Sequence, residues 1–364
     1  MTTVGSMIDL PSLGDPEAAL DHGLAPCQES VDEGLHAEAC ERAAEMYRRC
    51  LAERDSVPTV FRPGGEWDRY IAERSTLYEA IRSGDKTRVS DMLRSFWRNE
   101  LGTIVKEYAT FEQLSDREQP RAGRFMEMLP RNYAIWREIV RADPSALDIP
   151  AVGEPWGMEI DGRLVAPKAT RYHALATQCA ELVRGRDGER IAEVGAGYGG
   201  MAYFLLRDHP EFSYADYDLP ETLVIAAYAL ICSLPGQRVT LYGEKDAAGV
   251  VGRPGATLLP NYAIADAPPR CFDLTVNTFS FSEMPAPTLS RTLDEVTRST
   301  RGFLLHHNMD RPGVVNRGAE RIPASTFPIF PSDWRLLHRG FDLFHGAEGD
   351  YREYLYQRLP GAKG

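Results

Sequence analysis

Apolar and polar positions follow helical spacing in the first part of the chain and alternate between strand and helix patterns in the second. Helical patterns cover residues 35–54, 67–83, 86–97, 101–114 and 123–141. From residue 172 onwards, short apolar runs that read as buried strands alternate with helix-patterned segments. This alternation is typical of an α/β fold built on a parallel sheet.

The pattern divides the chain into three parts. Residues 1–34 carry Gly, Pro, Asp and Ser without a sustained period and predict a flexible N-terminal arm. Residues 35–150 predict a helical N-terminal domain, in which Pro130 should kink or divide its helix. Residues 151–364 contain the strand and helix alternation and predict the domain that carries the chemistry.

A Pro- and Gly-rich connector, residues 143–171, precedes the predicted sheet. Within it, Met158–Ile160 and Arg163–Val165 flank Asp161-Gly162 and predict a small β-hairpin. This hairpin comes immediately before the sheet, where a lid over a substrate pocket could lie.

The most informative stretch is residues 190–206, R-I-A-E-V-G-A-G-Y-G-G-M-A-Y-F-L-L. An apolar strand pattern ends at Val194, four glycines follow, and a helix pattern begins at Met201. Glycine allows positive φ angles and the close approach of a ligand to the backbone. The stretch therefore predicts the first half of a nucleotide-binding βαβ unit.

Two ligand classes fit this glycine turn. Gly195, Gly197 and Gly200 satisfy the dinucleotide pattern G-x-G-x-x-G. Glu193, Gly195, Gly197 and Gly199 equally satisfy E-x-G-x-G-x-G. The acidic residue two places before the first glycine favours the second pattern.

The second predicted strand, residues 212–217, ends at Asp218. Asp218 follows the glycine turn by about twenty residues, the spacing at which a carboxylate reaches a ribose diol. Asp216 is the competing candidate for this role. Alternatively, Asp218 could cap the helix that begins near Pro220.

Composition excludes several classes of function. The chain has 364 residues, of which 43% are hydrophobic and 26% charged, and its formal net charge is −12. An acidic protein without a Lys/Arg cluster is not expected to bind nucleic acid. Six scattered cysteines without a C-x-x-C pair offer no zinc framework. With neither a leader nor a bilayer-spanning apolar run, we expect a cytoplasmic protein without a membrane partner.

Several motifs together resemble a family of sugar O-methyltransferases, within the class I enzymes that use S-adenosylmethionine (SAM). These motifs are E-V-G-A-G-Y-G-G, Y-D-L-P-E-T-L and F-D-L-T-V-N-T-F-S-F-S-E-M, preceded by E-P-W-G-M-E-I-D-G-R-L-V and R-Y-H-A. The resemblance covers residues from about 150 to about 310. It implies a Rossmann-like, seven-stranded sheet whose last two strands are residues 334–339 and 353–358.

The resemblance also implies SAM as the cofactor and S-adenosylhomocysteine (SAH) as its product. Glu193 would then lie near the methionine part of SAM and pair with its ammonium group. The residues expected to contact the cofactor are Glu193, Gly195, Ala196, Gly197, Gly199, Asp218, Leu219 and Asn277.

A sugar hydroxyl needs a base near the methyl donor, because it is a weak nucleophile until its proton is removed. His306 and His307 follow the apolar strand of residues 302–305, and imidazole titrates in a useful range. We prefer His307, because a loop residue that turns outward reaches substrate more readily. Glu283 could be a base, could orient the histidine, or could cap a helix near Pro285.

Three further residues are expected to bind the acceptor: Tyr172, His173 and Asn308. Glu283, Asn308 and Asp310 could supply oxygen ligands to a divalent metal. No D-x-D-like cluster supports this, so the sequence does not favour a metal site.

These observations predict a SAM-dependent O-methyltransferase that transfers methyl in line to a sugar hydroxyl, with a histidine base. The sugar would belong to a glycosylated natural product or a nucleotide-linked sugar. The alternatives are an NAD(P)-dependent oxidoreductase using G-x-G-x-x-G, a SAM-dependent N- or C-methyltransferase of another small molecule, and a methyltransferase-like scaffold without activity. We expect a homodimer. The N-terminal helices could form the dimer contact or close over the acceptor.

Overall fold

The computed structural model describes residues 31–64, 66–105, 120–186, 188–244, 251–315, 319–345 and 350–360. Most of the predicted N-terminal arm, residues 1–30, therefore lies outside the described residues. The predicted end of the arm is two residues too late, because the first described helix begins at Glu33.

One large sheet organises the described chain. Its strands are β3 (Arg190–Val194), β4 (Ser213–Asp218), β5 (Val239–Leu241), β6 (Gly255–Pro260), β7 (Phe272–Thr278), β8 (Thr300–Met309), β11 (Trp334–Phe341) and β12 (Tyr351–Arg358). They lie in the order β11-β12-β8-β7-β3-β4-β6-β5. The strands from β8 to β5 pair in parallel, whereas β12 is antiparallel to both β8 and β11.

The predicted α/β, Rossmann-like fold is confirmed. The predicted number of seven strands is wrong, because the sheet has eight. Strand β5 pairs in parallel with β6 and forms the edge of the sheet. Helix α2 (Glu33–Glu53) covers that edge, where Arg42 Nη2 donates a hydrogen bond to the carbonyl of Val239 over 2.6 Å. Covering an edge strand in this way blocks pairing with another chain.

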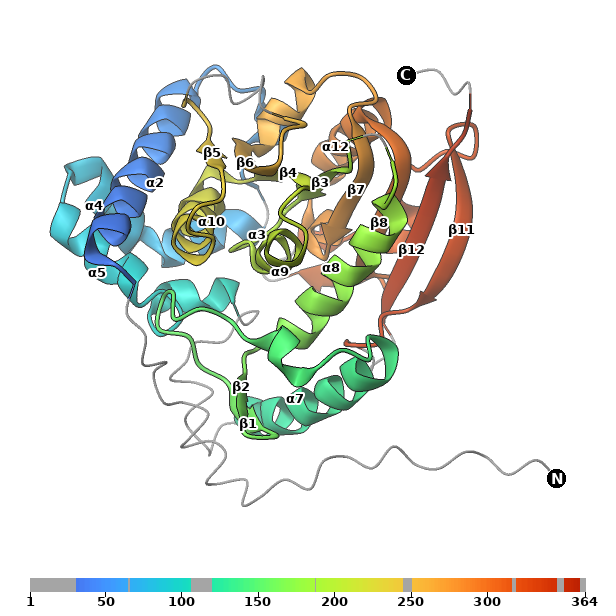
Figure 1. Cartoon of the computed structure of the whole chain (residues 1–364). Coiled ribbons are helices and arrows are strands. Elements are labelled where there is room, and N and C mark those ends of the chain that lie inside the picture. The colour runs from blue at the N-terminus through green and yellow to red at the C-terminus, as the bar shows by residue number, and fades with distance from the viewer. Residues whose placement is uncertain are drawn as a thin grey trace.

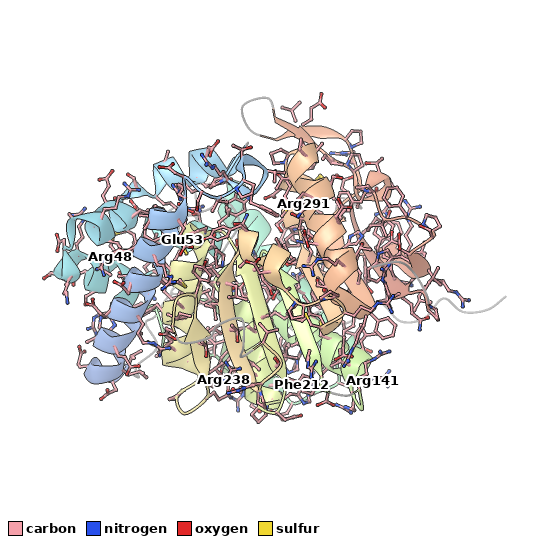
Figure 2. All side chains as sticks on the ribbon, turned by 90° about the horizontal axis from the view of Figure 1, so that it is seen from above. Arg48, Glu53, Arg141, Phe212, Arg238 and Arg291 are labelled. Carbon is pink, nitrogen blue, oxygen red and sulfur yellow. The ribbon has the colours of Figure 1, made fainter. Side chains whose placement is uncertain are left out.

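Helices cover both faces of the sheet (Figure 1). One face packs against α8 (Ala169–Val183), α9 (Gly200–Asp208) and α10 (Pro220–Ser233), and the other packs against α12 (Ala286–Ser299). Strand β3 shows why both faces are apolar, since Ile191 packs on the first side and Ala192 and Val194 on the second. Seen from above, the side chains of Phe212 and Arg238 lie at the end of the sheet opposite Glu53 (Figure 2).

The first part of the chain is helical as predicted, with different boundaries. It contains α2, α3 (Glu66–Glu73), α4 (Ser75–Ser83), α5 (Lys86–Arg94) and α7 (Pro120–Ile139). The helix predicted for residues 67–83 is two helices that meet at Arg74. Pro130 lies inside α7 and does not divide it. Of the helix predicted for residues 101–114, the described part is the 3-10 helix η2 (Glu100–Ile104).

The N-terminal helices share one core with the sheet. Helix α2 packs along α10, and Tyr47 and Tyr228 belong to the same cluster of buried side chains. Every residue of α10 except Ser233 is buried, because α10 lies between the sheet and α2. A helix that is apolar all round, as α10 is, suits such a fully enclosed position. The core is therefore continuous across the domain boundary predicted at residue 150.

The predicted hairpin is confirmed as β1 (Met158–Ile160) and β2 (Arg163–Val165), with Met158 opposite Val165. Its turn lies against α7, where the Tyr133 hydroxyl donates a hydrogen bond to Asp161 over 2.7 Å. A second hairpin consists of β9 (Gly313–Val315) and β10 (Ala319–Arg321). Within the described residues, none of the helices is both long and apolar enough to cross a bilayer.

Candidate functional site

A cleft of about 1120 Å³, partly open to solvent, lies at the carboxyl ends of β3, β4 and β7. This is the edge at which parallel α/β sheets bind their ligands. On the sheet side the cleft is lined by Val194, Gly195, Ala196, Gly197, Tyr217, Asp218, Leu219, Thr278, Phe279 and Ser280. The glycine turn and the tip of the second strand therefore meet in one cavity, as the sequence predicts.

Two glycines of the turn serve different purposes. Gly195 and Gly197 both have positive φ, at 77° and 68°. A Cβ on Gly195 would lie 2.3 Å from the Ser280 hydroxyl oxygen, so packing requires glycine there. A Cβ on Gly197 would meet only a side-chain carbon of Ile104, at 3.9 Å. The space beside Gly197 thus belongs to the cleft, where a ligand can approach the backbone.

Asp218 lies across from this turn. Its Oδ2 accepts a hydrogen bond from the Gly197 amide over 2.9 Å, and its Oδ1 accepts one from the Leu219 amide over 2.6 Å. Burial raises the pKa of Asp218 to about 7. The competing residue, Asp216, is completely buried in β4 and does not line the cleft. The residue that caps α10 is Leu219, not Asp218.

Glu193 lies behind the turn and not in the cleft wall. Its side chain is buried and accepts a hydrogen bond from the Tyr214 hydroxyl over 2.6 Å. Burial raises the pKa of Glu193 to about 7. Its position differs from the expected contact with the methionine ammonium of a cofactor.

Asn277 and Asn308 lie buried behind the cleft and connect the elements that form it. Asn277 Nδ2 donates to the carbonyl of Val194 over 2.8 Å, and Asn308 Nδ2 donates to Asn277 Oδ1 over 2.8 Å. Asn308 Oδ1 accepts a hydrogen bond from the Ser282 amide over 3.1 Å. Both side chains are fully buried and neither lines the cleft. They fix the 3-10 helix η5 (Ser280–Glu283), which carries Glu283, to the end of β3.

Glu283 lines the cleft, unlike the two histidines that were the first candidates for a base. It lies at the end of η5, beyond Phe279. Phe279 has a φ of 71°, a strained value for a residue with a side chain, and its amide donates to the carbonyl of His307 over 2.7 Å. Strain of this kind is typical of loops that serve a ligand site.

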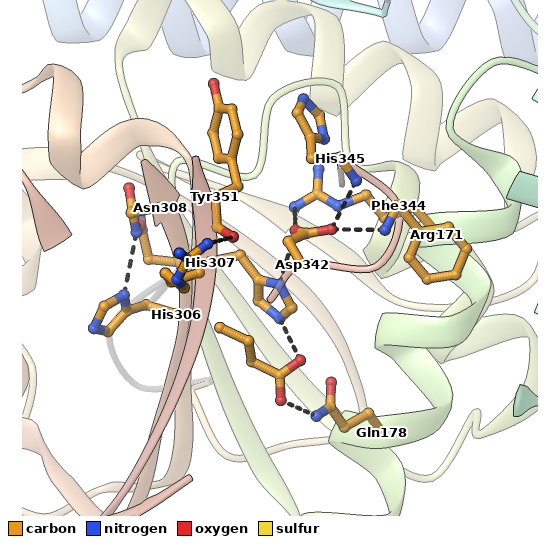
Figure 3. A network of polar contacts seen from close by, with 12 residues as sticks. Arg171, Gln178, His306, His307, Asn308, Asp342, Phe344, His345 and Tyr351 are labelled. Atoms are coloured by element: carbon orange, nitrogen blue, oxygen red, sulfur yellow. Dashed lines mark hydrogen bonds and ion pairs between the residues drawn. The ribbon is translucent and has the colours of Figure 1, made fainter. Parts of the chain in front are cut away.

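His306 and His307 are not loop residues, which corrects the prediction that the strand ends at residue 305. Strand β8 continues to Met309 because β12 pairs with it from Phe303 to Met309. The two rings lie on opposite sides of β8, and neither lines the cleft (Figure 3). Their placement therefore does not support the predicted histidine base.

Each ring has its own buried environment. The His306 ring stacks on Tyr354 with 4.9 Å between ring centroids, and burial lowers its pKa to about 3. His307 Nδ1 lies 3.0 Å from Asp342 Oδ2. Both contacts stabilise the interior of the fold.

The adjacent residues Tyr172 and His173 point in different directions from α8. Tyr172 lines the cleft. His173 points toward α7, where its Nδ1 accepts a hydrogen bond from the Trp136 indole over 3.1 Å, and its Nε2 is 3.5 Å from Asp208. Successive residues of a helix point about 100° apart, so only one of the two can face the cleft. The predicted acceptor role of His173 is therefore not supported.

The outer wall of the cleft comes from the N-terminal helical region, which is one of the two roles that the sequence left open for it. The individual wall residues were not identified from the sequence. The wall residues are Arg62, Pro63, Gly64, Trp67, Tyr70, Arg74, Thr103 and Ile104. The Trp67 and Tyr70 ring centroids are 5.7 Å apart, and the Arg74 guanidinium lies 4.6 Å from the Tyr70 ring centroid. The spacing of these three residues along one helix face was the available signal. The predicted lid hairpin, β1–β2, does not line the cleft.

The candidate metal ligands do not come together. Asn308 is engaged beneath η5, and Asp310 accepts hydrogen bonds from the Ser325 amide and the Arg339 guanidinium, each over 2.7 Å. In the described part of the chain, no group of three or more His, Cys, Asp or Glu residues could hold a metal ion.

No protein-family model and no curated protein matches this chain. Among solved structures, it is similar to the [4+2]-cyclase SpnF, with 18% identity over 56% of this chain and 86% of that chain and a TM-score of 0.39. It is similar to magnesium protoporphyrin IX methyltransferase (ChlM) from Synechocystis PCC 6803, crystallised with SAM, with 11% identity over 52% of this chain and 83% of that chain and a TM-score of 0.35.

A third similar structure is the PH0226 protein from Pyrococcus horikoshii OT3, with 12% identity over 61% of this chain and 99% of that chain and a TM-score of 0.36. These likenesses concern the fold alone. Function is therefore argued from the residues of the cleft.

Proposed function

We propose that the protein is a SAM-dependent methyltransferase that methylates a hydroxyl of a sugar, carried by a natural product or a nucleotide. One observation carries the proposal: a single cleft joins Gly197 and Asp218 on one side to Trp67, Tyr70 and Glu283 on the other. A nucleoside-binding half and an aromatic, charged half are thus adjacent. A methyl donor and a polar acceptor need this arrangement to react.

The residues of the first half fit the cofactor. Gly197 leaves open space beside its Cα, and Asp218 presents a carboxylate that can accept both hydroxyl hydrogens of a ribose. Leu219 lines the cleft next to Asp218 and offers an apolar surface to a nucleobase. When bound, SAM supplies an electrophilic methyl group on a sulfonium cation. The glycine turn and Asp218 would hold SAM and orient it.

Strand order favours SAM over a nicotinamide dinucleotide. The common dinucleotide sheet is parallel with the order 3-2-1-4-5-6. Here β12 is antiparallel and lies between β8 and β11, which separates this sheet from the dinucleotide arrangement. The G-x-G-x-x-G pattern alone does not outweigh that difference.

The second half of the cleft suits a sugar. Sugar rings present C–H faces that pack on aromatic rings, and their hydroxyls take hydrogen bonds from charged groups. Trp67 and Tyr70 supply the rings, and Arg62 and Arg74 supply donors. We assign the base to Glu283, because it is, besides Asp218, the carboxylate that lines the cleft among the described residues. A base at this position would take the proton of the sugar hydroxyl as the new bond forms.

The first test is binding and turnover by the full chain. Calorimetry should show binding of SAM and SAH, and mixing with NADH should give no fluorescence enhancement. Transfer of labelled methyl from SAM should then be measured over a panel of glycosides and nucleotide sugars. Absence of SAM and SAH binding would contradict the proposal, and NADH enhancement would favour the oxidoreductase.

The second test addresses the base. Glu283→Gln should keep SAH affinity within about twofold and lower kcat by about a hundredfold or more, the usual contribution of a general base. Glu181→Gln, an exposed carboxylate of α8, is the matched control and should change neither quantity. Full kcat in Glu283→Gln would show that another group takes the proton.

A further inference from the structure

Arg171 is a cleft residue that sequence reasoning did not identify. Arg171 lies in the first turn of α8, is 5% exposed, and lines the cleft together with Tyr172. Its guanidinium carbon lies 3.7 Å from the centroid of the Phe279 ring. That ring packs against both His345 and Tyr351, with centroid distances of 4.5 and 4.9 Å, and the latter two rings also contact each other. The planar guanidinium is therefore fixed in position before any ligand binds.

The donors of Arg171 are not all used by the protein. Nη2 is buried and has no hydrogen-bond partner among the described residues. The nearest carboxylate oxygen, Asp342 Oδ2, lies 3.8 Å away and also faces His307 Nδ1 at 3.0 Å (Figure 3). The other oxygen of Asp342 accepts hydrogen bonds from the Phe344 and His345 amides. Asp342 compensates the charge of Arg171 without occupying Nη2.

A buried guanidinium with an unused donor has a clear chemical preference. Leaving such a donor without a partner costs free energy, which a ligand acceptor would recover. The N-terminal end of α8 and the cation of Lys168, which also lines the cleft, add positive potential around it. Arginine forms its strongest contacts with carboxylate and phosphate groups, often through two parallel hydrogen bonds.

We propose that Arg171 is the anion-binding residue of the cleft and takes a carboxylate or phosphate group of the bound ligand. The identity of the ligand rests on the proposed function. The anion would be the carboxylate of the methionine part of SAM, or a phosphate of a nucleotide-linked acceptor. Asp342 and Phe279 act as positioning residues that hold the guanidinium toward the cleft.

The test compares Arg171→Gln with Arg184→Gln, an exposed arginine at the other end of α8 that loses the same charge. Calorimetry should measure SAH and methylthioadenosine, which lacks the amino-acid part of SAH. If the anion is the SAM carboxylate, Arg171→Gln weakens SAH binding by about tenfold or more and leaves methylthioadenosine within about twofold. If the anion is an acceptor phosphate, Arg171→Gln keeps its affinity for SAH and for methylthioadenosine. Pyrophosphate then no longer raises the melting temperature of the variant as it does for the wild type.

A second variant guards against loss of folding in Arg171→Gln. Phe279→Leu keeps the charge and removes the stacking surface, so it should weaken binding of the same ligand by a smaller factor. Unchanged binding of SAH and pyrophosphate in folded Arg171→Gln would overturn the proposal. Because pyrophosphate needs no methyl donor, the anion site is tested even if SAM does not bind. Failure of the proposed function is thus distinguished from failure of the anion site.

Discussion

The carboxylate of Asp218 accepts a hydrogen bond from the amide of Gly197, with 2.9 Å between Oδ2 and N. This contact joins the tips of two neighbouring parallel strands, β3 and β4, at the mouth of the cleft. The same side chain therefore shapes the turn and presents its remaining acceptor capacity to a ligand. A substitution here should affect binding more than folding.

Asp218→Asn should weaken SAH binding by about tenfold or more, because an amide oxygen cannot accept both ribose hydroxyls as a carboxylate does. Asp216→Asn is the matched control. Burial raises the pKa of Asp216 well above its ordinary value, which favours the neutral form. Since Asp216 also does not line the cleft, an isosteric amide should leave binding nearly unchanged. Calorimetry of both variants checks the pair. The reverse pattern would mean that Asp216 is the ribose ligand.

Binding of SAH should depend on pH through Asp218. Its pKa is raised to about 7, and the ribose contact needs the ionised form, so binding at lower pH must release a proton. Affinity should fall by about tenfold per pH unit below pH 7 and level off above it. Isothermal titrations between pH 5.5 and 8.5 measure this slope. A flat profile in the wild type would contradict the role, and Asp218→Asn should be flat.

The raised pKa of Asp218 has the opposite effect on folding: the free energy of unfolding should fall as pH rises, whereas SAH affinity should increase. A buried acid whose folded pKa exceeds its unfolded pKa favours the folded state most below the unfolded value. Its contribution is then lost as pH rises from about 4 to about 7. Glu193, whose pKa is also raised to about 7, adds to the same trend.

Gly197→Ala should abolish SAH binding while the protein stays folded. Its φ of 68° makes alanine strained by about 1 kcal/mol, but the added methyl group meets no protein backbone and occupies the ligand's space. Gly84→Ala is the matched control, since Gly84 has a φ of 75° and open space around its Cα. Both variants should lose similar stability in urea unfolding. Retained SAH affinity in Gly197→Ala would show that the ligand does not approach this turn.

His306→Phe should make the protein less sensitive to acid. Because burial lowers the pKa of His306 to about 3, the unfolded chain takes up a proton first. The stabilising contribution is therefore complete above pH 6.5 and is lost as pH falls toward 3. Between pH 7 and pH 5 the wild type should lose about 2 kcal/mol more unfolding free energy than the variant. Urea titrations at the two pH values give this difference.

The exposed His338, changed to Phe, is the control and should behave as the wild type does in acid. Methyl transfer by His306→Phe should continue, since this ring does not line the cleft. Loss of turnover with intact SAH binding would indicate that one of the two histidines, and not Glu283, is the general base.

The features of the fold and of the site that follow from local sequence were predictable. The glycine turn, Asp218 and the hairpin turn at Asp161-Gly162 depend on a few neighbouring residues, whose backbone preferences are visible in the sequence. The placement of His306 and His307 was not predictable in this way. It depends on β12, some fifty residues later, which pairs with β8 and draws both rings into the interior.

The residues of the outer wall could not be identified from the sequence for a related reason. Trp67 and Tyr70 reach the site because α2 packs on α10 and η1 (Thr59–Phe61) packs on α12, and neither contact leaves a sequence signal. The sequence around Arg171 does not distinguish it from its neighbours Tyr172 and His173 as a ligand-binding residue. Its unused donor becomes visible only when Phe279 and Asp342 are in place.

The position of α10 between the sheet and α2 limits how this chain could be shortened. A fragment that begins after the N-terminal helices would leave Tyr228 and its apolar neighbours exposed to water, and Glu221 without the guanidinium of Arg54. A shortened or chimeric version of this protein would thus have to keep both halves of the polypeptide together.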